Sequence, residues 1–175
     1  FEIPVQPPSV PGMRLNALLT RMASAKARVI LGSPLTAIHA ADGRIQAVEY
    51  ASAGRATRVE TRAVILAAGG FESGALELDS YGAVADTVCG LPVMGPTGQL
   101  LHADFWGDEQ PLFLAGLAVD DSMRVVDENG KAVYTNLFAA GGNLAGATRW
   151  REKSGEGIAL ASALAAVDAI VEELK

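Results

Sequence analysis

The stretch Leu137-Phe138-Ala139-Ala140-Gly141-Gly142, followed after a loop by Ser154-Gly155-Glu156-Gly157-Ile158, decides the fold of this 175-residue chain. Residues 137–140 predict a short buried strand, and the glycines after it let the backbone approach a ligand because they carry no Cβ. The second segment predicts the start of an alanine-rich helix, whose N-terminal N–H groups stabilise negative charge. Together they predict the floor of a cofactor site; an ordinary strand–turn–helix joint is the alternative.

A second apolar run, residues 63–68, ends in Gly69-Gly70 and predicts another strand. An uninterrupted apolar run is typical of a strand buried on both faces, as in a parallel sheet covered by helices. Ligands bind at the carboxyl ends of such strands. We therefore expect an α/β fold in which a ligand binds where this run ends, at Gly69-Gly70.

The helix predicted for residues 157–174 is apolar on two sides and needs partners on both. One face is large: Leu160, Leu164, Val167, Val171 and Leu174. The other face is small and suited to lying close on a sheet: Ala161, Ala165 and Ala169. Only two strands of the buried type are available to cover this helix, and the chain begins without methionine. We therefore expect a piece of a longer protein, and we expect the isolated piece to self-associate.

The first third of the chain predicts a helix and an antiparallel β-meander. An apolar stripe at Leu15, Leu18, Leu19 and Met22 predicts an amphipathic helix over residues 13–25. Asp42-Gly43 and Gly54 are typical of tight hairpin turns, and Asn129-Gly130 predicts a further hairpin within residues 118–133. The remaining expected elements are strands at 29–31, 36–40 and 44–50, a loop at 80–82 and a helical turn at 97–101.

Composition excludes several classes of protein. The net charge of −6 and the lack of a lysine or arginine cluster indicate no nucleic-acid partner. Arg149, Arg151 and Lys153 lie close in sequence, but we interpret them as a solvated face. One cysteine, Cys89, excludes an internal disulfide, and two histidines indicate no metal site. No apolar run is long enough to span a bilayer, so we expect a cytoplasmic location.

Several motifs carry a family resemblance. Residues 63–71 are similar to the internal strand–glycine motif of two-dinucleotide-binding-domain flavoproteins, and the segment from Asn129-Gly130 to Gly141 is similar to their C-terminal flavin motif. Within that superfamily, residues 7–15, 136–141 and 157–164 together resemble the B subunit of anaerobic glycerol-3-phosphate dehydrogenase. The resemblance covers nearly the whole chain and only the C-terminal part of such a subunit.

The resemblance implies a Rossmann-like flavin-binding domain of which this chain is a C-terminal fragment, with an antiparallel β-meander and part of an inserted cap or substrate domain. It places the inserted helix and meander in residues 1–62 and the flavin-binding part in residues 63–175, with a cap-like segment at about 71–118. It implies a flavin, FMN or FAD, and a quinone-linked oxidation of glycerol 3-phosphate to dihydroxyacetone phosphate with electrons passed to a respiratory acceptor.

The family also implies partners and a location. It implies a catalytic A subunit and a membrane-anchoring iron–sulfur C subunit, which would attach the protein peripherally to the inner face of the cytoplasmic membrane.

Carried over by residue, the resemblance assigns Gly69 to the internal motif and Gly141 to the flavin turn. It assigns Gly155, Gly157 and Ile158 to the helix start facing the flavin N1–C2=O edge, where reduced flavin carries negative charge. Relatives place a carboxylate after the Ala-Gly pair to hold a flavin hydroxyl, whereas this chain has Gly142 and then Asn143, a weaker amide partner.

Glu156 lies in the helix start that should favour negative charge on the flavin. It would oppose flavin reduction if it pointed inward, so we expect it to face solvent. No Gly-x-Gly-x-x-Gly follows a strand, so we expect the fragment to retain no flavin and to be inactive alone.

Two other functions stay open. A fumarate-reductase-like or ketosteroid-dehydrogenase-like flavoprotein would use a catalytic Arg, His or Tyr, for which Arg149, His102 and Tyr81 are available without a recognisable motif. A non-enzymatic α/β module for binding a partner protein is the third reading. No catalytic residue is assigned; His39 and His102 are interpreted as surface or packing residues, and Cys89 as an inert buried thiol.

Overall fold

The computed structural model of the chain describes residues 9–104, 107–149 and 153–175. Arg151, for which a solvated position was predicted, lies outside these ranges. The helices are α1 (Val10–Ser24) and α3 (Gly155–Glu173), and short 3-10 turns are η1 (Phe71–Ser73), η2 (Pro111–Leu114) and η3 (Gly141–Asn143). The strands are β1 (Leu35–Ala41), β2 (Arg44–Ser52), β3 (Arg55–Glu60), β4 (Val64–Leu66), β5 (Leu76–Leu78), β6 (Val84–Asp86) and β7 (Leu137–Ala139). The mixture of helices and strands confirms the α/β class.

The antiparallel meander predicted for the first third is confirmed. Strands β1, β2 and β3 form one sheet in that order, with both neighbouring pairs antiparallel. The two turns have positive φ at both central residues, Asp42 and Gly43 in the first, Ala53 and Gly54 in the second. Turns of this kind match the right-handed twist of the flanking strands, which explains why Asp-Gly predicted the first turn correctly.

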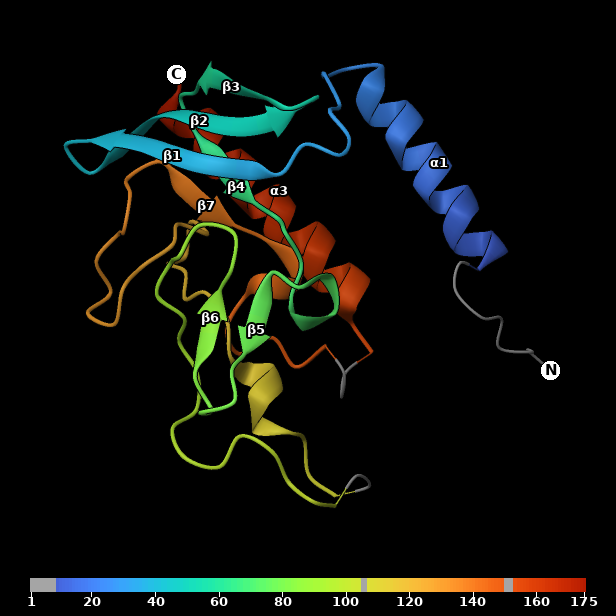
Figure 1. Ribbon diagram of the computed structural model, residues 1–175, viewed down its shortest axis with the longest axis vertical. Helices are drawn as coiled ribbons and strands as arrows, with labels where there is room; N and C mark the ends of the chain where they lie inside the picture. Colours follow the sequence, from blue (N-terminus) through green and yellow to red (C-terminus); the bar gives the residue numbers. More distant parts are fainter. Residues whose placement is uncertain (1–8, 105–106, 150–152) are drawn as a thin grey trace.

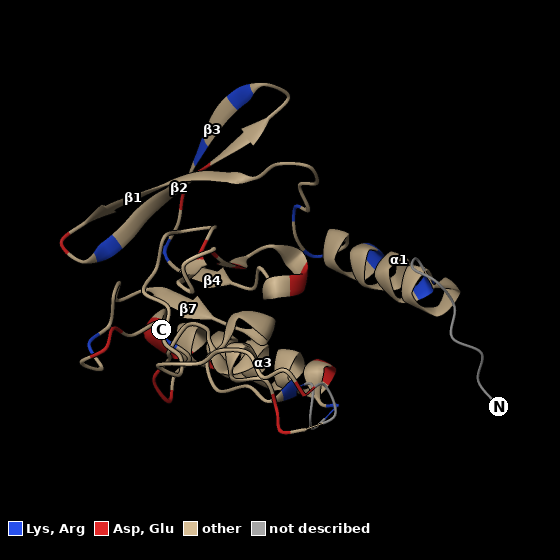
Figure 2. Cartoon of the chain, turned by 60° about the horizontal axis from the view of Figure 1, so that its bottom comes forward, with Lys and Arg blue, Asp and Glu red and all other residues tan. Residues whose placement is uncertain are grey.

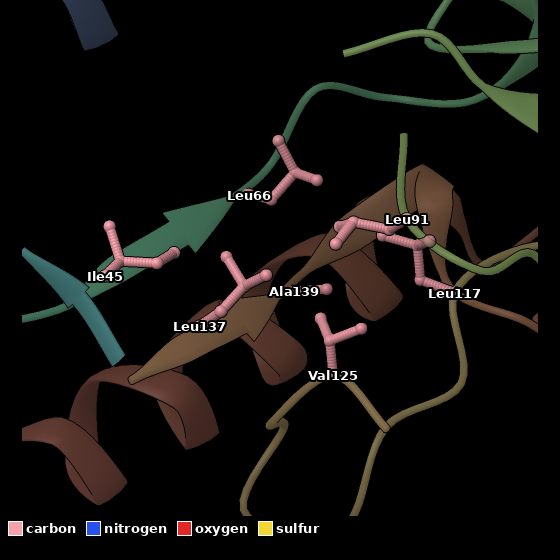
Figure 3. Close-up of a cluster of buried hydrophobic side chains, with 7 residues drawn as sticks. All are labelled: Ile45, Leu66, Leu91, Leu117, Val125, Leu137 and Ala139. Atoms are coloured by element: carbon pink, nitrogen blue, oxygen red, sulfur yellow. The ribbon is translucent and has the colours of Figure 1, made fainter. Parts of the chain in front are cut away.

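The two apolar runs form a parallel pair, as predicted. Strand β4 pairs with β7 in a register that places Ile65 opposite Phe138, and the Ala140 N–H donates to the Leu66 carbonyl at 3.0 Å. One face of this pair contacts the buried core shown in Figure 3, which draws on β2, β4, β7 and the loops between them. The core consists of Ile45, Leu66, Leu91, Leu117, Val125, Leu137 and Ala139. Both strands therefore end at the same edge, each followed by a glycine pair.

Helix α3 lies beside β7 (Figure 1), but the face it buries differs from the predicted one. Ser162 and Ala166 are its buried residues, whereas Ala161 is exposed. Ser162 faces the sheet because its hydroxyl accepts a 2.9 Å hydrogen bond from the Gly141 N–H, and we call this bond the polar anchor. This anchor turns the helix so that positions i and i+4 from Ser162 face the sheet. The large apolar face at Leu160, Leu164, Val167, Val171 and Leu174 is exposed.

Helix α1 begins three residues before the predicted start, at Val10, because the Ser9 hydroxyl accepts from the Gly12 N–H and caps it. It stands apart from the sheets in Figure 1, and none of its residues is buried. The predicted strand at residues 29–31 is wrong: this exposed segment joins no sheet in the described chain. The predicted helical turn at residues 97–101 is also wrong, because Gly98 has a φ of +99° that a right-handed turn does not allow.

The middle of the chain contains a hairpin that the sequence did not predict. Strands β5 and β6 pair antiparallel, and the loop predicted at residues 80–82 is part of their turn. The turn predicted at Asn129-Gly130 is confirmed, with Gly130 at a φ of +74°. Its flanking segments form isolated bridges, such as Val126 with Ala132, instead of regular strands. Phe113 packs edge-on against Phe71, with ring centroids 6.2 Å apart, as expected of a packing aromatic.

One buried amide joins the meander to the parallel pair. Asn136 immediately precedes β7 and is 1% exposed. Its side chain accepts from the Ile45 N–H at 2.8 Å and donates to the carbonyls of Ile45 and Arg62, each at 2.9 Å. Because Ile45 belongs to β2, these three hydrogen bonds fix the meander against the start of β7.

Charged residues are spread over the described elements in small groups of both signs (Figure 2). Within the residues that the structure describes, no helix is long and apolar enough to cross a membrane. No group of three or more His, Cys, Asp or Glu side chains in the described ranges could hold a metal ion.

Candidate functional site

A cleft of about 400 Å³ lies where β4 and β7 end and α3 begins. A volume of this order is within the range of small-molecule sites. Glycines supply five of its eleven lining residues: Gly69, Gly70, Gly141, Gly142 and Gly155. The remaining lining residues are Glu72, Ser73, Arg149, Glu156, Ile158 and Ala159. The cleft thus brings together the two segments predicted as a cofactor floor and the glycine turn at residues 69–70.

The first wall is the turn after β4. Gly69 has a φ of +86°, and a Cβ there would lie 2.4 Å from the Ser73 hydroxyl oxygen, so this position requires glycine. The Ser73 hydroxyl lies 2.8 Å from the Ala68 carbonyl oxygen and 2.9 Å from that of Gly70, within hydrogen-bond distance of both. The turn is therefore closed by its own side chain and presents backbone to the cleft.

The second wall is the turn after β7. Gly141 has a φ of +81°, which favours glycine, and its N–H is bonded to Ser162 on α3. The same hydroxyl donates to the Ile158 carbonyl at 2.5 Å, so the glycine turn is tied to the first part of α3. This bond holds the second wall and the helix start at a set distance.

The third wall is the N-terminal turn of α3. The first hydrogen bond of the helix joins the Ile158 N–H to the Ser154 carbonyl at 2.9 Å. The N–H groups of the residues before Ile158 have no partner within the helix, because no earlier turn supplies a carbonyl, and this end carries partial positive charge. A Cβ at Gly155 or Gly157 would meet nothing within 4 Å, so the approach to this end is open. Glu156 is exposed, as predicted, although it borders the cleft.

The cleft also contains an ion pair that the sequence did not predict. The Arg149 guanidinium lies 2.8 and 3.1 Å from the two carboxylate oxygens of Glu72, and 19% of the Arg149 side chain is exposed. The interpretation of Arg149 as part of a solvated face is therefore wrong. Its guanidinium packs against glycine backbone, because a Cβ at Gly142 would lie 2.3 Å from Nη1 and one at Gly70 would lie 2.7 Å from Nη2.

Two of the predicted cofactor residues do not line the cleft. Gly157 is exposed just beyond it, on the first turn of α3. Asn143 is 2% exposed, and its amide nitrogen donates to the Leu66 carbonyl at 3.0 Å, while its Oδ1 is buried without a hydrogen bond. The amide therefore links the end of β4 to η3. The predicted contact of Asn143 with a flavin hydroxyl stays a prediction.

The other candidate residues lie outside the cleft. Tyr81 is 94% exposed on the β5–β6 turn, and His102 is exposed in a loop held by Gln110. His39 lies on β1, with its Nε2 3.4 Å from a Glu49 carboxylate oxygen. Cys89 is half-buried, and burial, with a smaller contribution from the charge of Asp86, raises the pKa of its thiol to about 11. The thiol is thus less buried than predicted, but its raised pKa agrees with the prediction that it is inert.

The residues present fit the edge of a flavin ring. Glycine backbone on two walls leaves room for a flat group, and the positive end of α3 faces the same space. A cradle for the cofactor phosphates is a different requirement, and the sequence has no Gly-x-Gly-x-x-Gly after a strand. The cleft therefore suits the ring and not the phosphate end of the cofactor.

Comparisons with known proteins found a family model and curated relatives that match this chain. A family model described as an FAD binding domain matches residues 86–158. That range includes Gly141, Arg149 and the start of α3, but not the turn after β4. No solved structure matches the chain.

The curated relatives come from two strains of Halobacterium salinarum, R1 and NRC-1. Each is named as a probable B subunit of anaerobic glycerol-3-phosphate dehydrogenase and is 29% identical to this chain over 178 residues. The match covers 99% of this chain and 41% of each relative, so the chain spans about two fifths of the length of the proteins it matches. The resemblance predicted from the motifs is thereby confirmed: over nearly its whole length, this chain is similar to the B subunit of anaerobic glycerol-3-phosphate dehydrogenase.

Proposed function

We propose that this chain forms one side of the flavin site of a flavin-dependent oxidoreductase subunit. The observation that carries the proposal is the glycine-walled cleft at the shared edge of β4 and β7, which faces the N-terminal turn of α3. When bound, the flavin supplies the two-electron acceptor. This chain would place the flavin ring against glycine backbone. The positive end of α3 would stabilise negative charge on the ring. Gly69, Gly141, Gly155 and Ile158 are the proposed contacts, with Gly142, Gly157 and Asn143 as further candidates.

We further propose that the whole protein takes part in oxidising glycerol 3-phosphate to dihydroxyacetone phosphate. This rests on the names of the relatives and on the 99% coverage of the chain. The oxidation removes the hydrogen on C2 with its bonding electron pair and the proton of the C2 hydroxyl, and the electrons pass to a quinone. Neither FMN nor FAD is favoured by the cleft, because the cleft would hold the flavin ring, which the two cofactors share.

The proposed assembly follows from the same resemblance. A B subunit implies companions, and we propose a catalytic A subunit and a membrane-anchoring iron–sulfur C subunit. The protein would then attach to the inner face of the cytoplasmic membrane through its partner. In the parent protein, residues 1–62 are the proposed inserted helix and meander, and residues 63–175 the proposed flavin-binding part, with a cap-like segment at about 71–118.

The test is reduction of bound flavin by substrate. The full-length protein, purified with its partner subunits, should lose its oxidised-flavin absorption when glycerol 3-phosphate is added without oxygen. The second candidate, a fumarate-reductase-like enzyme, is favoured by one observation only: Arg149 lies in the cleft, whereas His102 and Tyr81 do not. It predicts that fumarate reoxidises the chemically reduced flavin and that glycerol 3-phosphate leaves the spectrum unchanged.

A further inference from the structure

The cleft side of Gly142 is filled by a side chain of this same protein. A Cβ at Gly142 would lie 2.3 Å from Nη1 of Arg149, a distance that real Cβ atoms do not adopt, and 3.4 Å from its Cζ. The φ of Gly142 is not positive, so the backbone itself does not demand glycine there. Glycine is needed at position 142 because the Arg149 guanidinium occupies the space that a Cβ would take.

Arg149 is held in that position from a distant segment. Both oxygens of Glu72, in the turn after β4, lie within hydrogen-bond distance of Nη2, and the two residues are 77 positions apart in the chain. Both contacts come from the same nitrogen, so the carboxylate fixes the position of Nη2, while the packing of Nη1 against Gly142 fixes the orientation of the guanidinium plane. The pair therefore spans the cleft from the first glycine wall to the second.

From this arrangement we infer that Arg149 is a positioning residue for the flavin. Glu72 holds its guanidinium against Gly70 and Gly142, so Arg149 sets the spacing between the two glycine walls on which the ring rests. The inference rests on the proposed function. It also reassigns Gly142: the residue is glycine to admit Arg149, not to touch the cofactor directly.

Gly70 provides a matched control. A Cβ there would lie 2.7 Å from Nη2 of Arg149 but also 2.6 Å from the backbone carbonyl oxygen of Gly142. Removing Arg149 relieves the first clash and leaves the second. By contrast, the shortest contact of a Cβ at Gly142 is with the flexible end of one side chain. The nearest backbone atom, the Gly70 nitrogen, would lie 3.3 Å away, so Gly142→Ala mainly moves the arginine.

The experiment measures flavin affinity, by quenching of flavin fluorescence, and the melting temperature in the full-length protein and its variants. Arg149→Ala and Gly142→Ala should each weaken flavin binding at least about tenfold, and the double variant should bind no more weakly than Arg149→Ala alone, because both changes remove the same interaction.

Gly142→Ala should melt close to the unchanged protein. Gly70→Ala should lower the melting temperature whether or not Arg149 is present. Glu72→Gln, a change at a half-exposed side chain, should weaken binding without adding to the loss from Arg149→Ala.

The visible circular dichroism of the bound flavin provides a readout that a merely structural role would not move, since it reports the ring's orientation. It should change in the same direction in Gly142→Ala, Glu72→Gln and Arg149→Ala. If the double variant Arg149→Ala/Gly142→Ala binds flavin more weakly than Arg149→Ala alone, the flavin touches Gly142 itself and the inference is overturned. Unchanged flavin affinity in Arg149→Ala, Gly142→Ala or Glu72→Gln would also overturn it. A full-length protein that binds no flavin would refute the proposed function and the inference together.

Discussion

The substitution Asn136→Ala tests how the meander is attached to the parallel strand pair. It removes three hydrogen bonds from a side chain that is 1% exposed. The Arg62 carbonyl keeps a second donor, the Arg44 guanidinium at 2.7 Å, so only the N–H and carbonyl of Ile45 lose their partner. With about 1 kcal/mol for each lost bond and the buried groups left unsatisfied, we expect a loss of about 3 kcal/mol in the free energy of unfolding.

Urea denaturation of the full-length protein, followed by circular dichroism, measures this loss. Asn129→Ala is the matched control, because the same truncation on an exposed turn should change the free energy by less than about 0.5 kcal/mol. Asn136→Asp should be no better than Asn136→Ala, since a buried carboxylate would face the carbonyls of Ile45 and Arg62. A loss below about 1 kcal/mol in Asn136→Ala would refute the reasoning, because it would mean that these bonds do not hold the meander in place.

The remaining predictions concern single positions. Asn143→Asp should lower the melting temperature and bring no gain in flavin affinity, because its side chain faces the Leu66 carbonyl; tighter flavin binding would contradict this. Cys89 should react with iodoacetamide about 100-fold more slowly in the folded than in the unfolded protein at pH 8, because its pKa is raised from 9.0 to about 11; equal rates would count against its burial. Gly116→Ala should destabilise the protein strongly in thermal melts, because the Cβ would lie 2.5 Å from a backbone oxygen, whereas Gly157→Ala should not, since its Cβ meets nothing.

The elements that the sequence predicted well are those with a local cause. Strands β4 and β7 follow from uninterrupted apolar runs that end in glycines, a pattern typical of parallel strands, and the two strands do pair in parallel. Asp42-Gly43 predicted its turn because both residues adopt a positive φ, and Asn129-Gly130 predicted its turn because Gly130 does. Gly69, Gly141 and Gly155 were predicted as cofactor residues from equally local patterns, because each lies at a strand end or a helix start. The structure places all three in the lining of one cleft.

The features that escaped prediction depend on contacts between distant segments. Nothing near Glu72 in the sequence indicates that its partner is Arg149, 77 residues later. The buried face of α3 was misjudged because Ser162 is polar, and its role as the partner of the Gly141 N–H exists only in the folded chain. Strands β5 and β6 are three residues each, too short for an alternating pattern to identify them.

The visible absorption spectrum of the full-length protein tests the central claim most directly. If the glycine-walled cleft is one side of a flavin site, the purified protein carries the spectrum of bound oxidised flavin, or acquires it when reconstituted with FMN or FAD. A folded protein that is colourless and gains no flavin on reconstitution would contradict the claim and leave the cleft without its proposed ligand.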